Sequence, residues 1–440
     1  MKVAFRPYNH VFLVFMALVI HSSVLSQGSW ELMPIPTTKN LISISFVDSL
    51  TGWVVGDSGT ILHTNNGGQS WEVQESLTNN NIIDVFFLNS YYGWAASHSF
   101  SSFPYGTLLL RTIDGGVNWD TSSYHEDNIF ITSIYYLDSL AGWMGGTPHA
   151  LVSTVDGGSN WIQADIDTST LAFFPVLNIE FYDEQYGYAS GGIFDIAGVI
   201  WRTSNGGQKW YAIDPEDAPA DEVHGLYPFD SVNVIGSGGD PDFGFGVGFT
   251  KTNNGGVSWE YYEVGIQGIA FDVDFVNDKE GWAPLGYENK FIYSVDTGNT
   301  WAEIATPELN SIFDITFTDS LHGYAVGSNG AFLKFAPQVP VSIDEIDYDS
   351  KFKIHQNYPN PFRNSTKIEF ECVETELLSP ISLMVYNIMG DEIASFIPEE
   401  KGDGHYQVII TNKVLSPGIY YYRIIGDEVV SEMKTMILVD

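Results

Sequence analysis

Short apolar runs separated by turn residues recur along most of the chain. Within residues 82–123, runs at 82–88, 93–97, 107–112 and 119–123 each have the length of a strand, and turn residues separate them. Four short strands then follow one another in about 40 residues. The pattern predicts an all-β protein with many tight turns.

The strand pattern is periodic because one octet recurs six times. It begins with Thr or Ser, has Asp or Asn at its third position and Gly at its fifth, and ends with Trp. The octets cover residues 64–71, 112–119, 154–161, 203–210, 252–259 and 294–301, so their tryptophans are 48, 42, 49, 49 and 42 residues apart. Upstream of them, an apolar strand and an acidic or amide turn lead to Gly-Trp or Gly-Tyr, as at Gly52 and Trp53. This second signal marks seven units within residues 41–336, one of them degraded at 230–234.

Four strands per unit are typical of the blades of a β-propeller. A lone blade leaves both of its faces uncovered, so we expect seven blades to pack in a ring. The seventh unit has three strands at 312–335 and no octet after them, whereas residues 28–32 resemble residues 69–73. We therefore predict that the N-terminal strand supplies the fourth strand of the last blade, which removes an unpaired sheet edge.

The octet resembles the Asp-box, or BNR repeat, of sialidase-like propellers, although three of the six copies carry Asn in place of Asp. The repeat region as a whole is similar to propellers of the photosystem II assembly and stability factor family. We interpret each octet as a hairpin turn in which the Asp or Asn side chain accepts backbone N–H groups, Gly adopts a positive φ and Trp packs in the blade. This structural role is assigned to Asn66, Trp71, Asp114, Trp119, Asp156, Trp161, Asn205, Trp210, Asn254, Trp259, Asp296 and Trp301.

Composition narrows the classes of function. The chain has 18 Lys+Arg against 55 Asp+Glu, a net charge of −37, which disfavours nucleic acids and anionic membrane surfaces as partners. The single cysteine, Cys372, excludes an intrachain disulfide framework and a Cys-rich zinc site. The ten histidines form no HExxH motif and no close ligand pair, so we predict neither a metal site nor a cofactor.

The sequence assigns no catalytic residues. A sialidase needs converging arginines to hold a carboxylate, and the propeller region has only Arg111 and Arg202, each placed just before an octet. No GxSxG motif marks a serine nucleophile. Another kind of glycosidase needs only two facing carboxylates. No acidic pair has diagnostic spacing, so this alternative stays open.

Loop geometry indicates where a ligand could bind. The octets link strands three and four on one rim, and the loops between strands two and three and between blades share the opposite rim. Acidic residues of the segments 214–224 and 236–244 are expected to converge on one sector of that rim as a polar or cation-assisted patch; the alternative is a solvated acidic surface. The candidate ligand-binding residues are Asp217, Asp221, Glu222, His224, Asp240 and Asp242.

The N-terminal segment has the pattern of a signal peptide. Lys2 and Arg6 precede an apolar run at 11–20 that is too short to cross a bilayer but fits an h-region. We predict a signal peptide at 1–26, with a short membrane anchor as the alternative, then the propeller at 27–336 and a linker at 337–351. We expect no integral membrane span in the mature chain.

Residues 352–440 are predicted to form a second module, a small Ig-like β-sandwich, because alternating apolar strands follow the linker. The segments 356–362, 385–390, 415–421 and 434–439 resemble the type A sorting domain of the type IX (Por) secretion system. The resemblance implies a Gram-negative bacterium, contact with the secretion machinery, and export across the outer membrane to the surface or the medium.

Together these features predict a secreted or cell-surface propeller that acts as a non-catalytic binding or scaffold module. Its ligand would be an extracellular glycan or protein. A photosystem partner is not carried over from the resemblance, because a secreted protein never meets one. The alternative is an extracellular glycoside hydrolase of a non-sialidase type.

Overall fold

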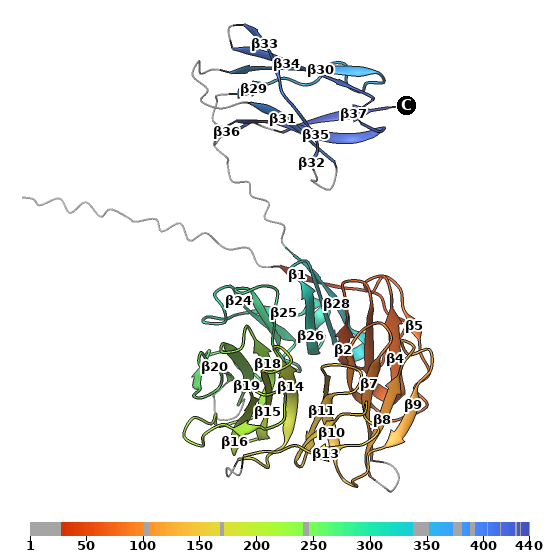
Figure 1. Cartoon of the computed structure of the whole chain (residues 1–440), viewed down its shortest axis with the longest axis vertical. Helices are drawn as coiled ribbons and strands as arrows, with labels where there is room; N and C mark the ends of the chain where they lie inside the picture. Colours follow the sequence, from red (N-terminus) through yellow and green to blue (C-terminus); the bar gives the residue numbers. More distant parts are fainter. Residues whose placement is uncertain are drawn as a thin grey trace, which may run out of the picture. The chain divides into compact units, whose positions relative to one another are not determined.

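The computed structural model describes residues 28–439 except for 101–104, 168–170, 241–245, 338–351, 373–380, 388–391, 403, 414, 427–428 and 432. The predicted signal peptide, almost all of the predicted linker and Asp242 therefore lie outside the described residues. The chain divides into two compact units between Gln338 and Val339 (Figure 1).

Seven antiparallel four-stranded sheets form the described part of the first unit (Figure 1). Each sheet is one blade, and its strands are given in order from the centre of the ring outward. The first three blades are β2 (Leu41–Phe46), β3 (Gly52–Gly56), β4 (Thr60–Thr64), β5 (Glu72–Val73); β6 (Ile82–Phe87), β7 (Gly93–Ser99), β8 (Gly106–Thr112), β9 (Asp120–Ser123); and β10 (Phe130–Tyr136), β11 (Gly142–Thr147), β12 (Ala150–Thr154), β13 (Ile162–Gln163). The next three are β14 (Val176–Phe181), β15 (Gly187–Ile193), β16 (Ala197–Thr203), β17 (Tyr211–Ala212); β18 (Val223–Pro228), β19 (Val234–Gly239), β20 (Val247–Thr252), β21 (Glu260–Glu263); and β22 (Asp274–Phe275), β23 (Gly281–Pro284), β24 (Lys290–Ser294), β25 (Ala302–Ala305). The last is β26 (Ile312–Asp319), β27 (His322–Gly327), β28 (Phe332–Ala336) and β1 (Ser29–Leu32). Short 3-10 turns lie at Asp57–Gly59, Pro307–Leu309 and Ser328–Gly330.

The predicted closure of the ring is confirmed. Strand β1 pairs antiparallel with β28, with Trp30 opposite Phe335. The Trp30 ring is almost fully buried, and its centroid lies 5.1 Å from that of Phe291 and 5.9 Å from that of Trp282, both in the preceding blade. The N-terminal strand thus joins the last blade and seals it against its neighbour.

The Gly-aromatic pairs connect adjacent blades. The indole N–H of Trp53 donates to the carbonyl of Gly115 in the octet of the next blade at 3.1 Å, and the indole N–H of Trp94 donates to Gly157 of the following one at 3.4 Å. The glycine of each pair is needed because an aromatic ring of strand one covers it: a Cβ at Gly52 would lie 2.5 Å from the Phe46 ring. The repeated tryptophans therefore serve packing between blades.

The octets have the hydrogen bonds expected of a hairpin turn. In the second copy, the Thr112 hydroxyl donates to Asp114 Oδ1 at 2.9 Å, and the backbone N–H of Asn118 donates to the same oxygen at 2.9 Å. Gly115 and Gly116 have φ values of 74° and 84°, a region that suits glycine. The same contact between a hydroxyl and the Asp or Asn side chain occurs in all six octets.

The second unit contains two sheets that share one core. One sheet has the order β29 (Phe352–Ile354), β30 (Ser365–Cys372), β34 (His405–Thr411), β33 (Glu399–Gly402). The other has the order β32 (Glu392–Phe396), β31 (Ser382–Tyr386), β35 (Gly418–Gly426), β36 (Val429–Val430), with β37 (Lys434–Leu438) also on β35. Fully buried Ile368 and Ile410 from the first sheet pack in one cluster with Leu383 and Met436 from the second. This arrangement is a β-sandwich, and its Ig-like topology stays a prediction.

Substitution of Trp30 by Ala should lower the free energy of unfolding by about 3–5 kcal/mol, because it empties a buried aromatic cluster. The measurement is urea unfolding followed by circular dichroism, with Val73→Ala as the control because Val73 is exposed on an outer strand. Equal unfolding midpoints for the two variants would contradict a closing role for β1.

Candidate functional site

The first strand of every blade lines a central cavity of about 880 Å³. Two layers of side chains face it. The first layer contains Ser43, Asp84, Ser133, Asn178, Asp272 and Asp314. All of these except Asp272 follow a bulge in the inner strand. The second layer lies two residues further along each strand and contains Ser45, Phe86, Tyr135, Glu180, Tyr227, Asp274 and Thr316. We call Asp84, Glu180, Asp272, Asp274 and Asp314 the channel carboxylates.

Four channel carboxylates accept backbone N–H groups that the innermost strands cannot pair with another strand. The inner edge of each blade has no neighbouring strand, so its N–H groups need other acceptors. Asp84 in the second blade accepts the N–H of Ile134 in the third at 2.7 Å and the hydroxyl of Ser43 in the first at 3.0 Å. One carboxylate thus connects three blades.

Carboxylates also accept N–H groups of a neighbouring blade near the point where the ring closes. Asp314 accepts the N–H of Ile44 in the first blade at 2.9 Å, and Asp274 accepts the N–H of Phe317 in the last blade at 2.7 Å. Asp272 also accepts from the last blade, at the N–H of Ile315. Elsewhere hydroxyl groups substitute for carboxylates, as where Ser133 accepts the N–H of Ile179 at 3.1 Å.

Burial changes the ionisation of these groups. Enclosure by the channel walls is the main cause that raises the pKa of Asp84, Asp272 and Asp274 to about 7 and that of Glu180 to about 8. Burial and the neighbouring charge of Asp272 also hold the pKa of Asp314 well above its ordinary value. The Asp272 and Asp314 carboxyl groups hydrogen-bond each other, so the two titrate as a coupled pair.

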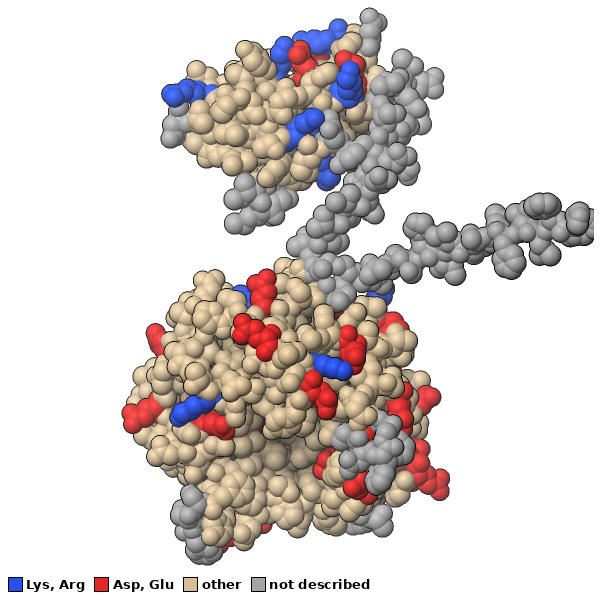
Figure 2. Space-filling model, turned by 180° about the vertical axis from the view of Figure 1, so that it is seen from behind, with Lys and Arg blue, Asp and Glu red and all other residues tan. Residues whose placement is uncertain are grey.

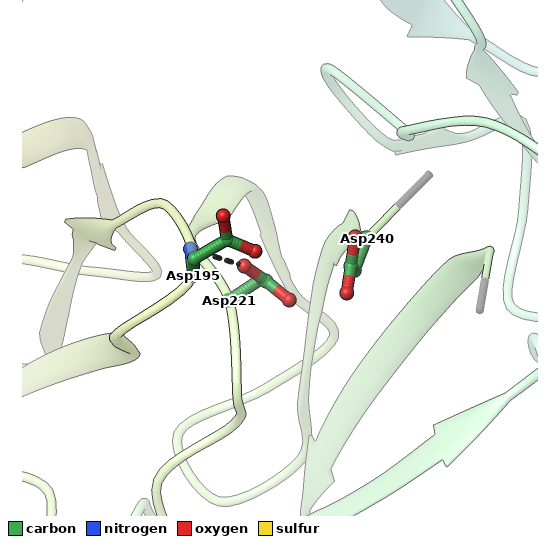
Figure 3. A group of neighbouring side chains, drawn as sticks. All are labelled: Asp195, Asp221 and Asp240. Carbon is green, nitrogen blue, oxygen red and sulfur yellow. Dashed lines mark hydrogen bonds between the residues drawn. The ribbon is translucent and has the colours of Figure 1, made fainter. Parts of the chain in front are cut away.

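A second acidic group lies at the rim (Figure 3). Carboxylate oxygens of Asp195, Asp221 and Asp240 all lie within 4.8 Å of one another, and Asp221 also accepts the backbone N–H of Asp195 at 2.7 Å. Asp221 and Asp240 are buried, whereas Asp195 is exposed. Burial, followed by the charges of Asp240, Asp195 and Glu222, raises the pKa of Asp221. Three converging carboxylates are a donor set that suits a hard divalent cation.

The structure brings together only part of the predicted rim patch. Asp221 and Asp240 belong to the group of three. A carboxylate oxygen of Glu222 instead lies 3.5 Å from His224 Nε2, a contact that is an ion pair only when the imidazole is protonated, and His224 lines the central cavity. Asp217 lies in a turn closed by its N–H to the carbonyl of Asp214, outside the group of three, and Asp242 lies outside the described residues.

Sequence reasoning missed Asp195 and all five channel carboxylates. Asp195 lies in the turn between β15 and β16, on a loop recognised as part of the ligand rim, but its distance from Asp221 depends on how the blades pack. The channel carboxylates had a visible signal, because each interrupts an apolar strand, as in the Phe-Asp-Val-Asp-Phe run at 271–275.

Charged side chains of the described residues are distributed differently on the face of each unit that Figure 2 shows. Figure 2 shows more acidic than basic side chains on the visible face of the propeller unit, whereas Lys and Arg prevail on the visible face of the C-terminal unit. No helix among the described residues has the length and apolar character needed to span a membrane.

Comparison with known proteins agrees with both units. Residues 22–94 and 76–224 match the family described as photosynthesis system II assembly factor YCF48, and residues 356–438 match the secretion system C-terminal sorting domain. The chain carries a YCF48-like propeller and a secretion-system sorting domain. The sorting domain indicates secretion through the type IX system.

Curated relatives of the YCF48-like propeller come from photosynthetic organisms. The photosystem II assembly lipoprotein Ycf48 of Synechococcus sp. (strain CC9902) is 31% identical over 108 residues, which are 24% of this chain and 30% of the relative. The chloroplast photosystem II stability/assembly factor HCF136 of Arabidopsis thaliana is 23% identical over 289 residues, 52% of this chain and 70% of the relative. The matches span less than a third of the first two curated relatives.

Solved structures support the YCF48-like fold. A structure described as YCF48 bound to D1 peptide has a TM-score of 0.56 and 21% identity, and covers 71% of this chain and 99% of its own. YCF48 from Cyanidioschyzon merolae has a TM-score of 0.55 and 22% identity with the same coverage. At these identities the likeness establishes the fold alone.

The channel carboxylates make the stability of the protein depend on pH. Their folded pKa values lie above the value of about 4 in an unfolded chain, so they contribute stability below pH 4 that is lost as pH rises through 7 and 8. We expect the melting temperature to fall between pH 5 and pH 8.5. Glu180→Gln removes one such charge and should raise the melting temperature at pH 8.5 by roughly 2–4 °C, about 1 kcal/mol, with little effect at pH 5.

The matched control for this prediction is Glu72→Gln, because Glu72 is exposed on β5. Differential scanning calorimetry of the three proteins at both pH values measures the effect. A Glu180→Gln protein that melts lower than the wild type at pH 8.5 would mean that the ionised carboxylate is stabilising.

Proposed function

We propose that this protein is a secreted, non-catalytic binding module whose propeller presents a ligand surface and whose residues 352–440 direct its export. The observation that carries the non-catalytic part is the way in which the channel aspartates are held. A glycosidase places a sugar between two carboxyl groups roughly 5 to 9.5 Å apart. The Asp272 carboxyl group instead contacts that of Asp314. Asp84 and Asp274 each accept a hydrogen bond from a backbone N–H group of the next blade.

Ligand contact is proposed on the rim that carries Asp195, Asp221 and Asp240. Loops on that rim differ from blade to blade in length and composition, whereas the octet rim repeats one turn. Recognition on loops held by a rigid scaffold is common among binding proteins. The sequence-derived candidates Asp217, Asp221, Glu222, His224, Asp240 and Asp242 remain the proposed contacts, and Asp195 joins them.

The proposed ligand is an extracellular glycan or protein. The related YCF48 structure is described as holding a peptide, which supports a macromolecular partner for a propeller of this fold. The type IX machinery is the proposed partner of the C-terminal unit, and the cell surface or the medium of a Gram-negative bacterium is the proposed destination.

Removal of the C-terminal unit should prevent export. A chain truncated after Ser350 is expected to accumulate in the periplasm, because the propeller alone lacks the sorting domain. Cell fractionation and immunoblotting measure the distribution, with the full-length chain as control. Delivery of the truncated chain to the surface or medium at full yield would contradict the proposal.

The propeller should retain a polysaccharide or protein ligand without cleaving it. Purified protein is incubated with a polysaccharide panel, and both retention and released reducing ends are measured. Asp221→Asn combined with Asp240→Asn should weaken retention at least fivefold, whereas Asp120→Asn, exposed on β9, should not. Release of reducing ends that a channel substitution such as Asp274→Asn abolishes would favour a glycoside hydrolase instead.

A further inference from the structure

The central cavity of the propeller has an excess of hydrogen-bond acceptors. Asp57 and the five channel carboxylates line it, and no Lys or Arg is among its described lining residues. His224 is the one imidazole among these described residues, and a Glu222 carboxylate oxygen lies 3.5 Å from its Nε2. The charge of the walls is therefore not balanced by basic side chains of the wall itself.

Two hydrogen-bond acceptors on β14 differ from the carboxylates that accept N–H groups of a neighbouring blade. Asn178 Oδ1 is buried and has no hydrogen-bond partner among the described residues. Glu180 is the channel carboxylate whose raised pKa comes from burial and like charges with no hydrogen bond to offset them. Alternate residues of a strand face the same side, and both side chains line the cavity. A ligand with N–H donors in the cavity would satisfy Glu180 directly, whereas Asn178 Oδ1, which has almost no accessible surface, would have to turn toward it.

Aromatic rings face the same cavity. The centroids of Phe86 and Tyr135 lie 5.0 Å apart within it. At its opening, Tyr287 is 76% exposed and its ring centroid lies 5.3 Å from that of Phe313. Faces of aromatic rings attract organic cations, so acceptors and rings together favour one class of ligand.

We propose that the central channel binds an organic cation, the guanidinium or ammonium side chain of a basic peptide, which donates hydrogen bonds to Glu180. This inference goes beyond the proposed rim contacts, because it assigns a second binding site and a ligand class to the channel. A guanidinium offers five N–H donors in a fixed plane and suits both carboxylates and aromatic faces.

A bare metal ion fits the channel less well. Calcium takes six to eight oxygen ligands at about 2.3–2.6 Å, which requires carboxylates that are free to converge. The channel aspartates are instead fixed by N–H groups of neighbouring blades, as Asp84 is by Ile134. A cavity of about 880 Å³ also exceeds the space of one ion.

Binding of a cation should release protons. A positive charge beside Glu180 favours its ionised form, and burial together with the charges of the aspartates raises the pKa of this group to about 8 in the free protein. The titratable groups that share the cavity with Glu180 are Asp57, Asp84, Tyr135, Tyr182, His224, Tyr227, Asp272, Asp274, Tyr287 and Asp314.

The test is calorimetric titration of residues 27–440 with tetra-arginine at pH 7 in two buffers of different ionisation enthalpy. Tetra-citrulline, which has the same shape without the charge, is the ligand control. We expect tetra-arginine to bind with proton release and tetra-citrulline not to bind. Glu180→Gln should weaken binding at least tenfold and reduce proton release, whereas Glu72→Gln on the outer strand should change neither. Melting curves verify that both variants fold.

Three results would overturn the inference: unchanged affinity in Glu180→Gln, equal weakening by both variants, or binding of calcium chloride without binding of tetra-arginine. The second would indicate general attraction to an acidic surface. Retention of a polysaccharide by a protein that does not bind tetra-arginine would refute this inference alone. Hydrolysis of that polysaccharide would refute the proposed function and leave cation binding to be judged by the titration.

Discussion

The inner edge of each blade imposes the constraint on which the rest of the propeller depends. Seven strands face the channel with N–H groups that no further strand can pair, and an unpaired buried N–H costs about 1–3 kcal/mol. The protein supplies acceptors from the neighbouring blade, such as Asp84 for Ile134 and Asp314 for Ile44. Side-chain acceptors therefore hold the centre of the ring, while the outer part is held by tryptophans and octets.

This solution has an electrostatic consequence. Carboxylates are strong acceptors, but enclosure by the channel walls, and then repulsion between neighbouring carboxylates, raises their pKa, so protons are retained to higher pH. The channel becomes a rigid wall of acceptors with an unbalanced charge. Stability, ionisation and the proposed affinity for a basic side chain thus have one physical origin.

Much of the architecture could be predicted because its signals are local. An octet specifies its own turn, Gly52 and Trp53 mark a strand start, and Trp30 shows where the missing strand is. Even the degraded copy at 230–234 forms a blade, because Pro228 still pairs with Val234. The site could be predicted only in part. Asp221 meets Asp240 and Asp195 across two blades, and whether Asp84 or Glu180 faces solvent or a closed channel depends on the ring and not on neighbouring residues in the sequence.

The ionisation of Glu180 is the most direct test of the electrostatics of the channel, because this carboxyl accepts no N–H group from the described residues of a neighbouring blade and responds to the charges around it. Its side-chain carboxyl carbon can be followed by ¹³C NMR in protein labelled at glutamate, with assignment from the signal that Glu180→Gln removes. We predict a titration midpoint of about pH 8. A midpoint near 4, as for a solvated glutamate, would contradict an enclosed and mutually repelling set of channel carboxylates.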